Sequence, residues 1–179
     1  MTPRLTVPVS EHDHVQGPAA APVTLVEYGD FECPHCGAAH PIVQEIQQQL
    51  GSSLRFVFRQ FPLTNAHPHA QHAAEASEAA GAQNHFWPMH DLLFENQDAL
   101  EDVDLVRYAV ALSLDANQYV EELRGHVHAP RVRDDFMSGV RSGVNGTPTF
   151  FVNGVRHDGP HDLASLLGAI ETELAVAAG

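Results

Sequence analysis

The sequence contains no lysine, and its nine basic residues, all arginines, stand against 23 aspartates and glutamates. The resulting net charge of −14 repels phosphate backbones, which excludes nucleic acid as an expected partner. Long apolar runs are missing too, since none approaches the roughly 18 to 20 residues that a helix needs to cross a bilayer. We therefore expect no membrane insertion. The first residues contain no apolar stretch typical of a signal peptide. As written, the chain is expected in the cytoplasm, or in the periplasm if a leader has been removed.

Cysteine is also scarce, with two residues in 179. Two cysteines cannot form the disulfide framework of a small secreted scaffold. The hydrophobic content of 44% and the charged content of 18% are instead typical of a globular protein with a sizeable core. Both cysteines, Cys33 and Cys36, fall within one segment of four residues. That segment is where the sequence points to chemistry.

The apolar pattern of the first third of the chain predicts a strand–helix–strand unit. Residues 1–22 are rich in proline, alanine and histidine, and we expect an extended N-terminal lead-in over the surface. Residues 23–28 and 54–60 have the β-branched and aromatic character of strands. Between them, apolar residues recur at three- and four-residue spacing from Pro34 until Gly51 ends the helix. Such a crossover makes the two strands parallel.

Residues 66–142 are helical in pattern throughout. The expected helices cover residues 70–80, 86–94, 102–112, 115–123 and 131–142. Asp115 is suited to cap the start of the fourth. This block lies between the second and third strands, so we interpret it as an inserted helical subdomain.

The end of the chain predicts a hairpin followed by a helix. Asn153-Gly154 is a strong two-residue hairpin signal between the strands 149–152 and 155–157. Leucines and Ile170 then form an apolar stripe up to residue 174. We expect residues 23–65 and 143–179 to form one α/β core that carries the insertion.

The segment Cys33-Pro34-His35-Cys36 begins the first expected helix. Unpaired N–H groups and the helix dipole favour an anion there, which lowers the pKa of Cys33 and supplies the thiolate that attacks disulfides. Cys36, one turn inside, is the resolving thiol. Pro34 fits the first helical turn, and His35 can add positive charge or a hydrogen bond beside the Cys33 sulfur. Stabilising the thiolate stabilises the reduced form, so we expect an oxidising disulfide.

Two other interpretations of the cysteine pair stay open. The pair could be half of a metal site that binds or delivers a metal, but the absence of further cysteines would require histidine to complete it. It could also be merely structural. The group His67, His69 and His72 is interpreted as solvated histidines rather than a metal site. Asp30 and Glu32 would oppose a thiolate, and we expect them to be solvated turn residues.

Aromatic residues of the insertion are interpreted as its core rather than as a cofactor site. They are Phe86, Trp87, Phe94 and Tyr108. Because the insertion is expected above the active site, some of them could also line a groove over Cys33.

Three features together resemble the DsbA-like family of thioredoxin-fold proteins. They are Phe31-Glu-Cys33-Pro-His-Cys36 after a strand, the helical insertion, and Gly146-Thr147-Pro148-Thr149 before the hairpin. The resemblance covers roughly residues 15 to 178. It implies a thioredoxin fold with a helical subdomain inserted between the second and third core strands. The implied activity is thiol–disulfide exchange, with the Cys33–Cys36 disulfide in place of a cofactor.

The resemblance also implies roles that the apolar pattern cannot assign. Pro148 is the cis-proline that faces the disulfide, and the Thr147 backbone binds a substrate strand. Glu27 is the buried acid that relays the proton of Cys36. The implied partners are protein thiols and disulfides and an unidentified redox-recycling partner, with the chain acting as a monomer. A redox-sensing regulatory domain of a larger membrane protein is the remaining alternative.

Overall fold

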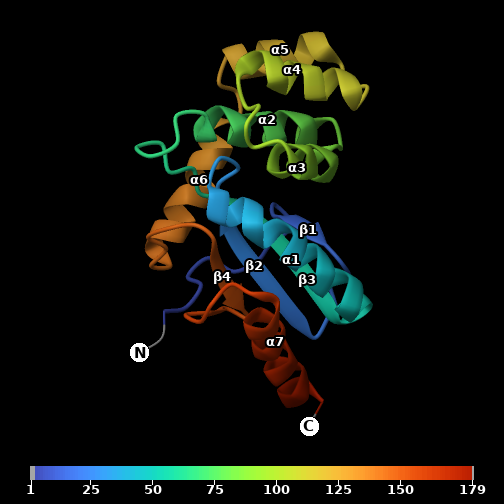
Figure 1. Ribbon diagram of the computed structural model, residues 1–179, viewed down its shortest axis with the longest axis vertical. Helices are drawn as coiled ribbons and strands as arrows, with labels where there is room; N and C mark the ends of the chain where they lie inside the picture. Colours follow the sequence, from blue (N-terminus) through green and yellow to red (C-terminus); the bar gives the residue numbers. More distant parts are fainter. Residues whose placement is uncertain (1–2, 179) are drawn as a thin grey trace.

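Within residues 3–178, which the computed structural model describes, the chain forms a five-stranded sheet with helices on both faces and a helical layer above one end (Figure 1). The strands lie in the order β1 (His14–Gln16), β3 (Leu54–Gln60), β2 (Val23–Gly29), β4 (Thr149–Val152) and β5 (Val155–Arg156). β2 and β3 are parallel, and the other neighbouring pairs are antiparallel. The parallel pair and the C-terminal hairpin expected from the sequence are confirmed.

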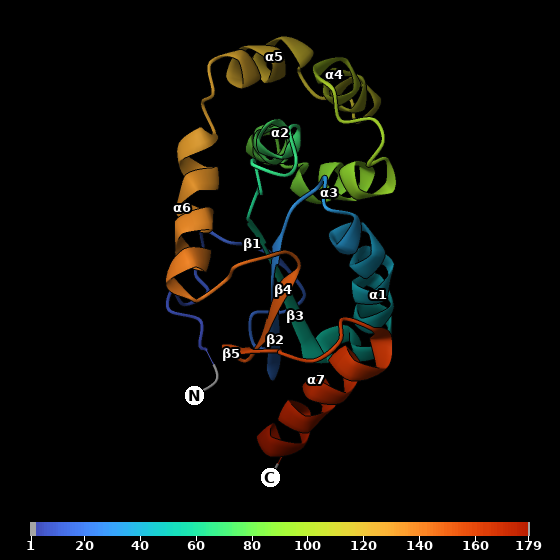
Figure 2. The ribbon, with the colours of Figure 1, turned by 60° about the vertical axis from the view of Figure 1, so that its left-hand side comes forward.

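Alternation along the central strands produces two apolar layers. Val23 and Leu25 face the layer that contains α1 (Pro34–Leu50) and α7 (Leu163–Ala177), whereas Val26 and Tyr28 face α6 (Ala129–Arg141) and the N-terminal segment. Figure 2 shows α1 and α7 on one side of the sheet and α6 on the other. By the same alternation, Glu27 of β2 points to the side of α1.

Helix α1 begins at Pro34 and ends before Gly51, as the sequence predicts. Gly51 has a φ of 49°, a left-handed conformation that costs glycine little. Pro41 lies inside this helix, which the sequence analysis did not predict. The residue is exposed, so its ring lies on the solvent side of α1.

Helices α2 to α6 separate β3 from β4 in the chain, and α2 to α5 build the layer above the sheet, whereas α6 runs down beside the sheet (Figure 1). The first four span Ala70–Ala82, Phe86–Glu95, Asp102–Ala111 and Ala116–Arg124. Phe86, Phe94 and Tyr108 are buried, so these aromatic residues are core as expected. Asp115 caps α5 by accepting from the N–H groups of the second and third residues of the helix.

In the part of the chain that the structure describes, no helix is both long and apolar enough to cross a membrane. Residues 1, 2 and 179, at the ends of the predicted segments, lie outside the described residues. The proposed boundaries at 22, 65 and 142 stay a prediction.

The N-terminal segment is more than a surface lead-in. Its strand β1 pairs with β3 and extends the sheet by one edge strand. Asp13 forms an ion pair with Arg59 of β3, with 2.7 Å between Oδ1 and Nε, and both side chains are buried. Arg59 also donates to the hydroxyl of Tyr28 over 2.9 Å. A strand of three residues is too short for an apolar pattern to indicate it.

Candidate active site

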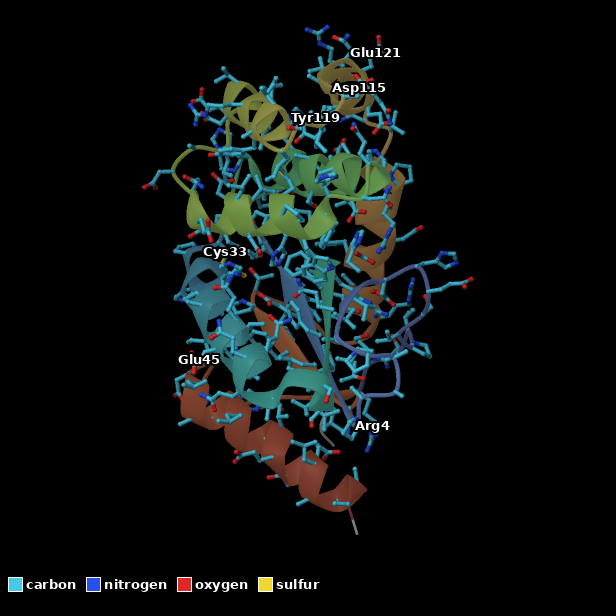
Figure 3. The ribbon with its side chains drawn as sticks, turned by 90° about the vertical axis from the view of Figure 1, so that its right-hand side faces the viewer. Arg4, Cys33, Glu45, Asp115, Tyr119 and Glu121 are labelled. Carbon is cyan, nitrogen blue, oxygen red and sulfur yellow. The ribbon has the colours of Figure 1, made fainter. Side chains whose placement is uncertain are left out.

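The two cysteines lie where α1 begins, at the end of the helix that faces the insertion (Figure 3). Cys33 is the N-cap residue with an extended backbone, and Cys36 follows in the first turn. Their exposed fractions are 3% and 0%, and both are free thiols. The Cys33 thiol donates to the backbone carbonyl of Thr147 over 3.4 Å. The fold therefore brings the cysteine segment and the Thr147-Pro148 segment together.

The environment of Cys33 favours a thiolate. A hydrogen bond from the Cys36 thiol is the largest influence and, with the N–H groups of His35 and Cys36, lowers the pKa of Cys33 to about 5 against the opposing effect of burial. The hydroxyl of Thr147 lowers it further. That hydroxyl is buried without another partner, so it is available to donate once the sulfur is charged. The His35 and Cys36 donors belong to the start of α1, where the helix dipole also favours an anion.

Cys36 and Glu27, in contrast to Cys33, are held in their protonated forms. Burial raises the pKa of Cys36 well above its usual value, and the charges of Glu27 and Cys33 add to this. Glu27 is 2% exposed, and burial, together with the nearby Cys33 charge, raises its pKa to about 8. One of its carboxyl oxygens has no hydrogen-bond partner. The burial expected for Glu27 is confirmed, and at neutral pH its carboxyl group holds a proton.

The peptide bond between Thr147 and Pro148 is cis, as the resemblance implies. Beside it, a groove of about 380 Å³ opens against the first two turns of α1. We call this the Pro148 groove; its lining residues are His35, Ala38, Ala39, Ile42, Thr147, Pro148 and His161. The groove gives an extended peptide access to the backbone of Thr147.

His35 supplies a hydrogen bond to the Cys33 sulfur, one of the two contributions expected of it, but through its backbone and not its side chain. Its backbone N–H is the group that bonds to Cys33, while the side chain is exposed and lines the Pro148 groove. Opposite lies His161, whose pKa is lowered by burial and by the charges of His157 and His35. His161 was not predicted, because no spacing in the sequence links it to the cysteines.

Asp30 is buried, so the expectation of a solvated turn residue was wrong for it, whereas Glu32 lies in the turn and is half-buried. The Asp30 carboxylate is buried and accepts from the backbone N–H groups of Glu32 and Leu63 and from the His67 ring, 2.7 Å away. Glu32 accepts from the backbone N–H and the ring of His69. Both carboxylates are engaged by donors, which reduces their repulsion of a Cys33 thiolate.

The histidines of residues 67–72 are therefore paired rather than merely solvated. Burial acts to lower the pKa of His67, but the bond and charge of Asp30, with the charge of Cys33, raise it overall. His72 pairs with Asp102 instead, over 2.7 Å. Each ring has its own carboxylate, so the three do not converge on one site. Among residues 3–178, no metal-binding cluster joins the two cysteines to a histidine either.

Gln97 is a supporting residue that the sequence analysis missed. Its Nε2 donates to the carbonyl oxygens of Phe31 and Cys33, over 2.9 and 2.8 Å. A Cβ at Gly37 would lie 2.0 Å from its Oε1, so a larger residue at position 37 would displace this side chain from its place against α1. Gln97 lies beyond the end of α3, in a segment without periodicity, and only the contact identifies it.

We expect Gln97→Ala to destabilise the protein by about 1 kcal/mol, because two carbonyl groups next to the cysteines lose a donor. The matched control is Gln49→Ala, which removes an exposed bond to Glu45. Urea unfolding of both variants measures the difference. Equal free energies of unfolding for the two variants would show that Gln97 does not hold this segment.

The chain is similar to known proteins in both sequence and structure. The sequence model of the family described as thioredoxin matches residues 9–172. Among curated proteins, a relative from Salinispora tropica named Na(+)/H(+) antiporter NhaA 3 is 51% identical over 174 residues. A relative from Salinispora arenicola, Na(+)/H(+) antiporter NhaA 1, is 49% identical over 172 residues. They match 97% and 96% of this chain, which spans about a quarter of their length, 26% in each case.

Solved structures match along nearly the whole chain. Oxidised BdbD from Bacillus subtilis is 26% identical with a TM-score of 0.83, and the match covers 97% of both chains. A thioredoxin-like oxidoreductase from Silicibacter pomeroyi is 25% identical with a TM-score of 0.79, covering 93% of this chain and 94% of the other. Alpha-DsbA1 from Wolbachia pipientis, at 21% identity and a TM-score of 0.81, shares the fold over 97% of this chain and 96% of its own.

Proposed function

The chain belongs to the DsbA-like family of thioredoxin-fold proteins, and we propose that it exchanges disulfides with protein substrates through Cys33 and Cys36. The observation that carries this proposal is the contrast between the two sulfurs. Cys33, with a pKa of about 5, is the nucleophile and the good leaving group, while Cys36 keeps its proton. The two sulfurs supply the redox chemistry, so the reaction needs no further cofactor.

In the oxidising direction, a substrate thiolate attacks Cys33 of the Cys33–Cys36 disulfide. The bond between the two protein sulfurs breaks, a mixed disulfide forms on Cys33, and Cys36 leaves as a thiolate that takes up a proton. A second substrate thiolate then attacks the substrate sulfur of the mixed disulfide and expels the Cys33 thiolate. The substrate loses two electrons and gains a disulfide. A separate redox partner reoxidises the protein.

Glu27 is suited to handle the proton of Cys36. It lies on the α1 side of β2, and when it is ionised its charge raises the pKa of Cys36. With a pKa of about 8, it can donate a proton as Cys36 leaves and accept one when Cys36 attacks. The same burial that raises its pKa excludes bulk water from this transfer.

The Pro148 groove is suited to bind the substrate segment. The Thr147 carbonyl accepts a hydrogen bond from the Cys33 thiol, so the Thr147 backbone lies directly beside the nucleophile. A peptide that pairs with this backbone would therefore place its cysteine against Cys33. Ala38, Ala39 and Ile42 give the groove an apolar wall. Backbone pairing combined with an apolar wall binds extended peptides without requiring one sequence.

Equilibration with glutathione redox buffers tests the direction of exchange. A stabilised Cys33 thiolate favours the reduced protein, so we expect a potential well above thioredoxin's, which is about −270 mV. The oxidised fraction is measured by thiol alkylation and mass spectrometry. A potential at or below that of thioredoxin would contradict the proposal that the protein acts as an oxidant. A cysteine pair that does not equilibrate with glutathione would contradict the proposed disulfide-exchange activity.

The names of the curated relatives favour a second candidate function. Two antiporters each contain a region about half identical to this chain, and that region is a quarter of their length. We infer that, in this second candidate function, the cysteine pair makes such a transporter respond to redox state. Sodium-dependent proton flux of the Salinispora tropica relative, measured in reducing and oxidising buffers, tests this. Equal flux in both buffers would contradict a redox-sensing domain.

A further inference from the structure

A second cluster of chemically capable side chains lies one turn beyond the cysteines. His40 follows Cys36 by four residues on α1, and it faces His90 and Asp91 of α3. Figure 2 shows α3 lying across the end of α1 where the cysteines are. Each of these three residues offers one potential metal-ligand atom, and the three atoms lie within 4.8 Å of one another. Within residues 3–178, no other group of three or more such residues meets this distance.

The distances fit a single bound ion. Asp91 Oδ1 lies 2.9 Å from His90 Nδ1 and 3.8 Å from His40 Nε2. Ligands of a tetrahedral zinc ion, with bonds of about 2.0 to 2.1 Å, lie about 3.3 Å apart. Both distances are within about 0.5 Å of that spacing, so small side-chain movements would bring the three atoms around one ion.

The two imidazoles are available as ligands. His40 and His90 are only 7% and 3% exposed, and burial is the main cause that lowers the pKa of each, so both rings are neutral at neutral pH. His40 Nε2, the atom that faces Asp91, is buried and has no hydrogen-bond partner. A buried ring nitrogen without a partner is unusual in proteins, and a cation bound by this nitrogen would supply the missing partner.

The surroundings hold the rings in place and leave one side open. His40 stacks on Phe94, and His90 meets Phe31 edge-on. The Asp91 side chain is 41% exposed, so the site has access to solvent on that side. Glu95, one turn further along α3, contributes a charge that acts on His40. Three ligands with a solvent-facing fourth position are characteristic of accessible zinc sites.

We propose that His40, His90 and Asp91 bind a divalent transition-metal ion such as Zn²⁺. Two imidazoles and a carboxylate select zinc and its neighbours over Mg²⁺ or Ca²⁺, which prefer oxygen ligands. The ion would join α1, which carries the cysteines, to α3 of the insertion. It would thus stabilise the contact between the active-site helix and the layer above it.

Cobalt titration of the full chain tests the site. The Cys33→Ala/Cys36→Ala variant serves as the background, because it removes binding by the thiols. We expect one Co²⁺ per chain with visible ligand-field absorption. His40→Gln and Asp91→Asn should each weaken binding by about tenfold or more. His72→Gln, which alters a histidine–carboxylate pair elsewhere, should leave it unchanged.

A second measurement does not depend on the spectrum. Zn²⁺ at about 100 times its dissociation constant should raise the Tm by at least about 5 °C, because it binds only the folded chain. His40→Gln should remove this shift. The proposal is overturned if the background variant binds no Co²⁺, or if binding is the same in His40→Gln as in His72→Gln.

Discussion

Replacing Cys33 with serine is expected to reduce disulfide exchange to the rate observed without protein. The serine hydroxyl has no accessible anion near neutral pH, so the donors that stabilise the Cys33 thiolate have nothing to act on. Insulin reduction and oxidation of a reduced model peptide both measure the loss. The largest effect of any single substitution is expected here.

Cys36→Ser is the matched control, because it keeps the nucleophile but removes the resolving thiol. Mixed disulfides on Cys33 should then accumulate and be visible on non-reducing gels. Full activity of Cys33→Ser, or mixed disulfides on Cys36 in that variant, would contradict the assigned order of attack.

Glu27→Gln is expected to remove a large pH dependence of stability. The folded-state pKa of Glu27 is about 8 against an ordinary value of 4.5, so the folded chain holds this proton more tightly than the unfolded chain. Stability therefore falls as pH rises from 4.5 to 8, and above 8 the fall levels off. Between pH 5 and 8 the fall is on the order of 3 kcal/mol.

The oxidised protein is the form to measure, because neither sulfur titrates in it and only burial, the larger of the two causes, then raises the pKa of Glu27. The fall measured there is the part of the effect that burial alone produces. Urea unfolding at pH 5 and pH 8 should show the fall in the parent protein and a much smaller one in Glu27→Gln. Glu45→Gln, at an exposed position of α1, is the control and should behave like the parent. The same slope in Glu27→Gln and the parent would show that Glu27 is not held protonated by burial.

The same Glu27→Gln substitution is also expected to slow the resolving step, in which Cys36 attacks the mixed disulfide on Cys33. Without the Glu27 carboxyl group, Cys36 has no internal acid or base, so the resolving step should slow by about 10² or more. Stopped-flow measurement of mixed-disulfide decay separates this step from the attack on Cys33. An unchanged decay rate would mean that the proton of Cys36 exchanges with solvent instead.

Much of the fold could be predicted because local patterns and long-range contacts agree. Two apolar strands around a helix can pair only as the parallel centre of a sheet, which is where β2 and β3 lie. Asn153 and Gly154 have φ values of 46° and 79°, as the two-residue hairpin turn requires. Asp115 caps α5 through bonds to residues two and three positions away. Each of these features is encoded within a few residues.

Polar contacts between distant segments could not be predicted in this way. Asp13 meets Arg59 across 46 positions, and Asp30 meets His67 across 37. Neither pair has a periodic signal, because each depends on where two separate loops or strands meet. The same holds for Gln97, which reaches Cys33 from beyond the end of α3. The spacing of the two cysteines at a helix start therefore indicated the reactive segment, but no local pattern indicated the groups that surround it.

The central claim is that the protein environment holds the Cys33 sulfur as an anion. The most direct test is the pH dependence of iodoacetamide alkylation of the reduced protein, with the modified residue located by mass spectrometry. The rate at Cys33 should reach half its maximum near pH 5 and be level by pH 7. A rate that still rises between pH 8 and 9, as for a cysteine with the ordinary pKa of about 8.5, would contradict it.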